Sequence, residues 1–219
     1  MTLIRYVLLT SGWLLAACTG LAVAQSSAPS TVVALQMPAL PDPVPVTVKA
    51  ATTALLVFDM VDPICTTQPK CMATMVHAVT SLLAKARSAS VFVLYSTREP
   101  TRSKWITQVA PAGGDPVMQS YGQDRFYNTD LDKILKDKGI TTLILAGWKV
   151  SGSVTYTSVG ATLRGYTVVV PQDASLAPTD YETAIGVFQI LNQLSANATN
   201  EPLKAKASTL SRADMITIQ

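Results

Sequence analysis

The sequence predicts an α/β three-layer sandwich with a mainly parallel sheet, and one stretch, residues 142–174, carries most of this prediction. It begins and ends with the apolar segments Leu143–Ala146 and Thr167–Val170, which are typical of strands buried on both faces. Between them, residues 153–164 carry apolar side chains at helical spacing, and Gly165 follows as a helix stop. Strand, helix and strand in this order form a βαβ unit, whose strands are parallel and whose crossover is right-handed.

Length and composition indicate one globular domain of ordinary size. The chain has 219 residues, of which 48% are hydrophobic and 14% are charged. Its net charge of +3 is small, and no basic cluster stands out, so the sequence does not favour binding to nucleic acid. No internal repeat is visible.

The N-terminus has the pattern of a signal peptide. Arg5 precedes the apolar segment Tyr6–Ala17, which is too short to span a bilayer. Small residues at 22–24 predict cleavage after Ala24, so residues 1–24 form the signal peptide. The segment that ends at Cys18 also fits a bacterial lipoprotein signal, with Cys18 as a lipid anchor. Either processing route predicts an exported protein, periplasmic or secreted.

An extended lead-in, residues 25–53, precedes the α/β domain, residues 54–219. Val44, Val46 and Val48 in the lead-in suggest an edge segment after two prolines. The domain itself begins with an apolar strand, Ala54–Phe58, that delivers Asp59 at its carboxyl end. A helix over Cys71–Ser88 and a strand over Val91–Tyr95 follow.

The second half of the domain is predicted in the same way. Residues 99–115, rich in Pro and Gly, indicate a long binding loop or lid. Thr129 and Asp132 form the pattern of a capping box for a helix that Gly139 ends. A last helix covers residues 179–194, and residues 207–210 suggest a final strand. Asn197 would be glycosylated only in a eukaryotic secretory route.

The cysteines predict a local disulfide. Cleavage after Ala24 removes Cys18 and leaves Cys65 and Cys71, an even pair in an oxidising compartment. A disulfide that closes so short a loop stabilises a protein by about 2–3 kcal/mol. The alternative is a reactive thiol at Cys65, because the loop follows a strand end.

Three segments together resemble a known family. ALLVFDM at 54–60, RFYNTDLDKILKDKGI at 125–140 and AGWKVSGSVTYTSVGATLRGYTVVVPQDA at 146–174 resemble the isochorismatase-like, or cysteine hydrolase, superfamily. The resemblance covers about residues 54–194. It implies an Asp at the end of the first strand, a Lys in mid-chain and a nucleophilic Cys at a helix N-terminus. In that family a non-proline cis peptide shapes the turn before the Cys, and backbone N–H groups bind the oxyanion.

Carried over position by position, the resemblance is partial. Asp59 matches the family's Asp, whereas Ser153 stands at the position of the Cys and Ser120 at about that of the Lys. The cis bond is expected between Trp148 and Lys149, and the N–H groups of Lys149 and Ser153 are expected to form the oxyanion hole. The order of the motifs also implies that Asp59 and Ser153 lie at the same edge of a parallel sheet, within about 8 Å between side chains, because neighbouring strand ends are close together.

The candidate catalytic residues are therefore Asp59 as base, Ser153 as nucleophile and Lys149 as the nearby cation. Alternatively, Ser153 only caps the helix, and Asp59 only bonds to backbone amides. Candidate ligand-binding residues are Ser120, Arg125 and Trp148, although Arg125 could instead form a solvated pair with Asp124.

Two functions remain open on the sequence. The first is an exported hydrolase of a small amide, ester or vinyl ether, and the second is an inactive relative that binds a small molecule or a partner. We expect no cofactor and no metal, since His77 is the only histidine and is expected to be a surface or core residue. We also expect no membrane span and a homo-oligomer.

Overall fold

The computed structural model describes residue 36, residues 39–193 and residues 208–219. Apart from Gln36, these residues belong to one compact unit, Met37–Gln219. The predicted signal peptide, both of its processing sites and the sequon at Asn197 lie outside the described residues. No helix in the described part is both long and apolar enough to cross a membrane.

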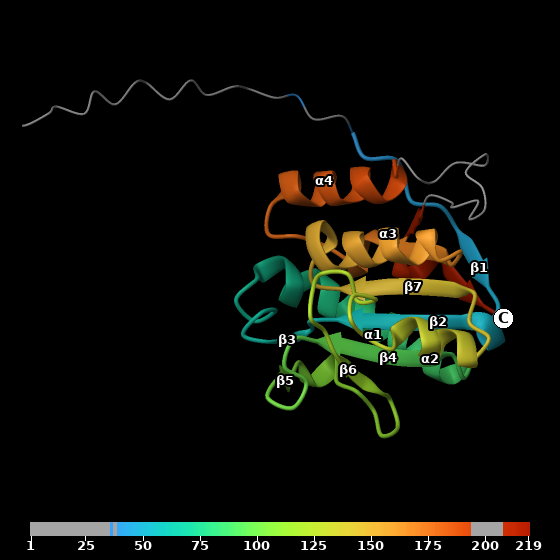
Figure 1. Cartoon of the computed structure of the whole chain (residues 1–219). Helices are drawn as coiled ribbons and strands as arrows, with labels where there is room; N and C mark the ends of the chain where they lie inside the picture. Colours follow the sequence, from blue (N-terminus) through green and yellow to red (C-terminus); the bar gives the residue numbers. More distant parts are fainter. Residues whose placement is uncertain (1–35, 37–38, 194–207) are drawn as a thin grey trace, which may run out of the picture. The chain divides into compact units, whose positions relative to one another are not determined.

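A six-stranded parallel sheet forms the centre of the domain (Figure 1). Its neighbouring strands, in spatial order, are β6 (Val117–Gln119), β4 (Phe92–Thr97), β2 (Thr53–Phe58), β7 (Thr142–Gly147), β8 (Thr167–Pro171) and β9 (Thr209–Ser211). Every neighbouring pair is parallel. The predicted fold class, an α/β sandwich around a mainly parallel sheet, is confirmed.

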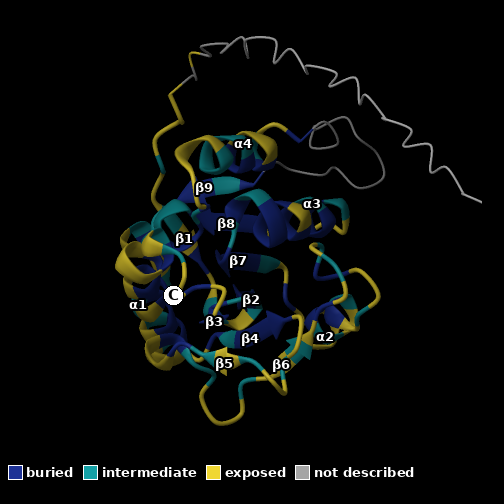
Figure 2. Ribbon diagram, turned by 90° about the vertical axis from the view of Figure 1, so that its left-hand side faces the viewer, coloured by how far each residue is buried: buried dark blue, intermediate teal, exposed yellow. Residues whose placement is uncertain are grey.

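Helices cover both faces of this sheet and create two cores. In β2 all six residues are buried, and successive side chains alternate between the two cores: Leu55 and Val57 on one side, Leu56 and Phe58 on the other. One face is covered by α1 (Val76–Ser88). The other is covered by α2 (Leu131–Asp137), α3 (Thr155–Leu163) and α4 (Asp180–Leu191). In Figure 2, α1 lies on one side of the column of strands, and α2 and α3 lie on the other.

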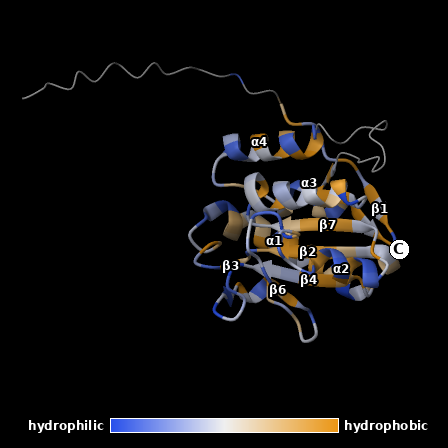
Figure 3. Ribbon diagram, viewed as in Figure 1, coloured by the Kyte–Doolittle hydropathy of each residue, from blue (hydrophilic) through white to orange (hydrophobic). Residues whose placement is uncertain are grey.

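The hydropathy pattern explains why the strands are central. β2 and β7 are among the most apolar segments in Figure 3, and they occupy the middle of the sheet. A strand covered on both faces needs a continuous apolar run, because neither set of its side chains reaches water. The sequence prediction of both strands rested on such runs, and the structure extends each by only one or two residues.

Two short ladders lie outside the central sheet. The parallel pair of β1 (Val46–Val48) and β10 (Ile216–Ile218) shows that the valine segment predicted at 44–48 is not an edge of the main sheet. β3 (Val61–Asp62) pairs with β5 (Lys104–Trp105) in the antiparallel sense. Short 3₁₀ turns complete the order of elements: η1 (Ala50–Thr52), η3 (Thr107–Val109), η5 (Gln172–Ala174) and η6 (Ala213–Met215).

Several predicted helix ends were wrong in detail. The predicted helix 71–88 starts with the π-type segment η2 (Cys71–Met75), and a second π-type turn, η4 (Val150–Val154), precedes α3. The capping box at Thr129 is not formed, because the Asp132 carboxylate bonds to Lys136 and to the Tyr166 hydroxyl instead. Residues 99–115 are not a structureless loop, since they contain β5 and η3.

Candidate functional site

A cavity of about 320 Å³ lies over the carboxyl ends of neighbouring strands. Ser120, Arg98, Asp59 and Trp148 directly follow β6, β4, β2 and β7, which are adjacent in the sheet in that order. All four line the cavity, together with Ile64, Tyr121, Gly122, Gln123, Arg125, Lys149, Gly152 and Ser153. Its volume is at the lower end of the range for small-molecule sites.

Asp59 lies at the carboxyl end of the central strand. Its backbone has φ of 51°, which Asp tolerates better than most residues, and its N–H bonds to the Ser96 carbonyl at 3.1 Å. The carboxylate forms an ion pair with Arg125, and the side chain is only 15% exposed. Burial raises the pKa of Asp59, and the contact with Arg125 and a hydrogen bond from Thr97 oppose that rise.

Arg125 is the cation that contacts Asp59. The prediction of a solvated pair with Asp124 was wrong, because Arg125 is buried, with 4% of its surface exposed. Its Nη1 donates to the Gly122 carbonyl at 3.0 Å, and the guanidinium lies 5.2 Å from the centre of the Phe58 ring. Thr157 on α3 accepts a hydrogen bond from the Arg125 N–H at 3.0 Å and so fixes this segment.

The turn after β7 brings Trp148 and Ser153 to the cavity. Gly147 has φ of 116°, and a Cβ there would come within 2.1 Å of the Phe58 carbonyl oxygen, so only glycine fits. The Trp148 N–H bonds to that same carbonyl at 2.9 Å. The peptide bond between Trp148 and Lys149 is cis, as the resemblance implies.

Ser153 is buried, and its hydroxyl donates to the Trp148 carbonyl at 2.8 Å. This contact makes Ser153 part of the turn, and it shows that the alternative prediction of a helix cap was wrong. The residue at the cap position of η4 is Lys149, that of α3 is Val154, and neither helix has a side-chain cap bond. In the described part of the chain, the Ser153 hydroxyl has no bond to a carboxylate, an amine or an imidazole.

Lys149 lines the cavity, but its ammonium pairs with another residue. Its Nζ lies 2.7 Å from the Glu182 carboxylate in the first turn of α4, and both side chains are about one third exposed. Lys149 in turn holds the pKa of Glu182 below its usual value. Asp59, Lys149 and Ser153 therefore meet at one cavity without forming a hydrogen-bonded chain among the described contacts.

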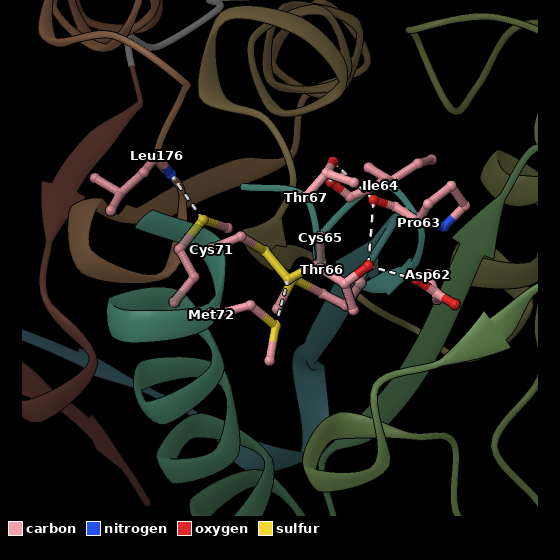
Figure 4. Close-up of a disulfide and its surroundings, with 11 residues drawn as sticks. Asp62, Pro63, Ile64, Cys65, Thr66, Thr67, Cys71, Met72 and Leu176 are labelled. Atoms are coloured by element: carbon pink, nitrogen blue, oxygen red, sulfur yellow. Dashed lines mark hydrogen bonds between the residues drawn. A yellow bond between two sulfur atoms is a disulfide. The ribbon is translucent and has the colours of Figure 1, made fainter. Parts of the chain in front are cut away.

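A disulfide begins at the residue after Ile64, which is one of the residues that line the cavity. The Sγ atoms of Cys65 and Cys71 are 2.05 Å apart, and this bond joins the loop that carries Ile64 to η2 (Figure 4). Lys70 in the same loop pairs with Asp180 at 2.6 Å, at the start of α4. The disulfide links Cys65, the residue after Ile64, to η2, and Ile64 is the apolar residue that this segment contributes to the cavity.

The structure also bears on metal binding. Among the described residues, no three His, Cys, Asp or Glu side chains gather closely enough to hold a metal ion, and His77 is exposed on α1.

Arg98, Gln123 and Ile64 line the cavity and were not predicted from the sequence. For Arg98 the available signal was its place after a strand, which is the signal that identified Asp59.

The sheet, its helices and a cavity over the carboxyl ends of its strands define an isochorismatase-like hydrolase fold. The Isochorismatase domain family matches residues 53–200, well over half of the chain, and the chain therefore belongs to this family.

Individual relatives are distant. The N-carbamoylsarcosine amidase of Thermoplasma acidophilum superposes with a TM-score of 0.59 and 23% identity over 74% of this chain and 97% of that one. An isochorismatase family protein of Burkholderia thailandensis gives a TM-score of 0.63 and 21% identity over 79% and 96%. YaaI, an uncharacterized isochorismatase family protein of Bacillus subtilis, is 26% identical over 96 residues, 44% of this chain. That match spans 53% of YaaI, so these comparisons support the fold and not a substrate.

Proposed function

We propose that this isochorismatase-family protein binds a small molecule in the cavity at Asp59 and does not use Ser153 as a nucleophile. The observation that carries the proposal is the hydrogen bond from the Ser153 hydroxyl to the Trp148 carbonyl. A serine hydroxyl attacks only when a base takes its proton, and here the proton is directed at a backbone carbonyl.

The partners of the other two candidate catalytic residues support the same function. Asp59 is held by Arg125, and Lys149 is held by Glu182, so neither is bonded to Ser153. The cavity itself is retained, with a buried ion pair and polar side chains that can recognise a ligand. A site of this kind binds without the covalent step that the family's Cys performs.

A second candidate is hydrolysis of a small amide, ester or vinyl ether by water that Asp59 activates. The observation that favours it is the burial of Asp59, which raises the pKa of its carboxyl group toward the range of a useful general base. In this case Ser153 would only shape the turn, and the N–H groups of Lys149 and Ser153 would bind the oxyanion.

Activity assays on a panel of small amides, esters and vinyl ethers, with Asp59→Asn, Ser153→Ala and Ser153→Cys, separate these functions. Non-catalytic binding predicts that wild type is inert, and that both wild type and Ser153→Ala bind the same small molecules by calorimetry. Turnover that Asp59→Asn abolishes and Ser153→Ala barely changes would establish the second candidate. A loss of about 10³-fold or more in Ser153→Ala would identify a serine nucleophile and overturn the proposal.

Iodoacetamide and Ser153→Cys provide the complementary test. Wild type is expected to be insensitive to iodoacetamide, because neither function uses a thiol. Ser153→Cys restores the family nucleophile in the same turn, and turnover gained only in this variant would show that the rest of the site is still competent. Such a gain would leave the proposal for the natural chain intact.

We further propose that the protein is exported and acts as a homo-oligomer. The support for export is the signal pattern in residues 1–24, together with a disulfide in the folded domain. Mass spectrometry of the mature N-terminus distinguishes cleavage after Ala24 from lipidation at Cys18. Light scattering of the purified protein measures the oligomeric state, and a monomer would contradict that prediction.

A further inference from the structure

The charges around the cavity do not balance. Asp59 faces Arg125, and Lys149 faces Glu182, so each of these pairs is neutral overall. Arg98 also lines the cavity, is exposed, and has no carboxylate within ion-pair distance in the described part of the chain. One positive charge is therefore left at the cavity.

The position of Arg98 makes this charge available to a ligand. Arg98 follows β4, which lies between β6 and β2, so its neighbours along the edge of the sheet are Ser120 and Asp59. Its charge is a minor influence that opposes the rise of the pKa of Asp59 caused by burial, and the two side chains form no ion pair. A guanidinium presents a planar fork of N–H donors that matches a carboxylate.

Two polar groups of residues that line the cavity have no hydrogen-bond partner in the described part of the chain. Ser120 is 5% exposed, and within the described residues its hydroxyl forms no hydrogen bond, although its backbone N–H bonds to Thr97. The Nε of Arg125 is buried and has no partner among the described residues. The Ser120 hydroxyl is therefore available to bond to a polar ligand in the cavity.

The remaining wall is apolar or aromatic. Ile64, Tyr121 and Trp148 line the cavity, and the loop carrying Ile64 is held by the disulfide. A planar or apolar body fits against such side chains, while its charged end lies toward the arginine.

We infer that the ligand is a small monoanionic carboxylate, with its carboxylate held by Arg98 and Ser120 and its apolar part against Ile64, Tyr121 and Trp148. The inference rests on the proposed function and names the ligand class of the same cavity. A single negative charge matches the single unbalanced positive charge, whereas a dianion would leave an excess of negative charge beside Asp59. Arg98 is then a specificity-determining residue.

Calorimetry with benzoate, benzamide and phenyl phosphate as probes tests the inference. These molecules share a ring and differ in charge. Benzoate is expected to bind at least about tenfold more tightly than benzamide, a difference of about 1.4 kcal/mol, and more tightly than phenyl phosphate. Added salt should weaken benzoate binding, because part of it is electrostatic.

Arg98→Gln and Arg102→Gln form a matched pair of variants. Both arginines are exposed in the same segment, but Arg102 pairs with Glu99 and does not line the cavity. Arg98→Gln should weaken benzoate binding at least about tenfold and leave benzamide binding unchanged, and Arg102→Gln should change neither. Circular dichroism and melting curves check that both variants fold like wild type.

The inference would be overturned if benzamide bound as tightly as benzoate, or if Arg98→Gln had no effect. It would also be overturned if benzoate did not bind up to about 10 mM, a concentration that detects even millimolar affinity. Tighter binding of phenyl phosphate would show that the site selects a dianion and would also overturn it. These results are independent of the turnover assays, so a serine nucleophile would refute the proposed function while leaving the anion preference measurable.

Discussion

The guanidinium of Arg125 forms an ion pair with the carboxylate of Asp59, which is 66 positions earlier in the chain. The resemblance implied a mid-chain Lys for this family, and the chain has Ser120 at about that position. In this chain the cation beside Asp59 is Arg125, which comes from the segment before α2. The electrostatic balance at Asp59 therefore depends on Arg125 and not on Lys149.

Arg125→Met should raise the pKa of Asp59 above its value in wild type. Arg125 is the strongest influence that opposes the effect of burial on this carboxyl group, and Met keeps the apolar length without the charge. NMR titration of the side-chain carboxyl carbons measures the change, with Asp59→Asn to assign the signal. Arg87→Met is the control, because it removes the partner of Asp115 and should leave the Asp59 titration where it was.

Asp59→Asn should be at least as stable as wild type at pH 7. The pKa of Asp59 is raised above its ordinary value of 3.8 in the folded protein, so the folded state binds the proton more readily than the unfolded state. As the pH rises through the window between the two values, wild type should lose stability relative to Asp59→Asn. Urea unfolding at a series of pH values tests this. The opposite trend would mean that Arg125 outweighs burial and lowers the pKa of Asp59.

Gly147→Ala should destabilise the protein by more than about 3 kcal/mol, because the added methyl overlaps the backbone of β2 at a positive φ. Gly165 offers a matched control: its φ is also positive, at 87°, but a Cβ there would meet nothing within 4 Å. Gly165→Ala should therefore cost only about 1 kcal/mol. Equal losses in thermal or urea unfolding would show that the close approach of β7 to β2 is unimportant.

Non-reduced mature protein should contain no alkylatable thiol if it is processed after Ala24, because Cys65 and Cys71 are bonded to each other. Replacing both by alanine should cost about 2–3 kcal/mol and should weaken benzoate binding, since Ile64 loses its covalent support. Intact-mass measurement after alkylation, followed by urea unfolding, checks both statements. Two modified thiols would disprove the disulfide and would make Cys65 a candidate nucleophile again.

The fold was predictable because its central strands consist mainly of consecutive apolar residues. β2, β7 and β8 are buried on both faces and are continuous apolar runs, and Asp59 directly follows the first of them. Arg98 was missed because the preceding strand was predicted to end at Tyr95. In the structure that strand continues through Ser96 and Thr97, two buried polar residues that look like the start of a loop in the sequence.

Contacts between distant segments were beyond the reach of the sequence pattern. The pairing of Arg125 with Asp59 and of Lys149 with Glu182 depends on side-chain directions at two loops, which periodicity does not encode. The direction of the Ser153 hydroxyl depends on the path of the backbone through the turn, which periodicity does not encode either. The position of the site was therefore easier to predict than its chemistry.

The order of the strands has a consequence for how this family can diverge. From β2 the chain builds outward through β4 to β6, and it then returns to the other side of β2 and builds outward through β7 to β9. The β2–β7 pair is thus a topological switch point, where successive connections diverge and leave a crevice that no crossover covers. Such a crevice belongs to the winding of the chain and survives the exchange of individual side chains. Serine at positions 120 and 153 changes the chemistry that the side chains in the crevice can perform, while the crevice itself persists.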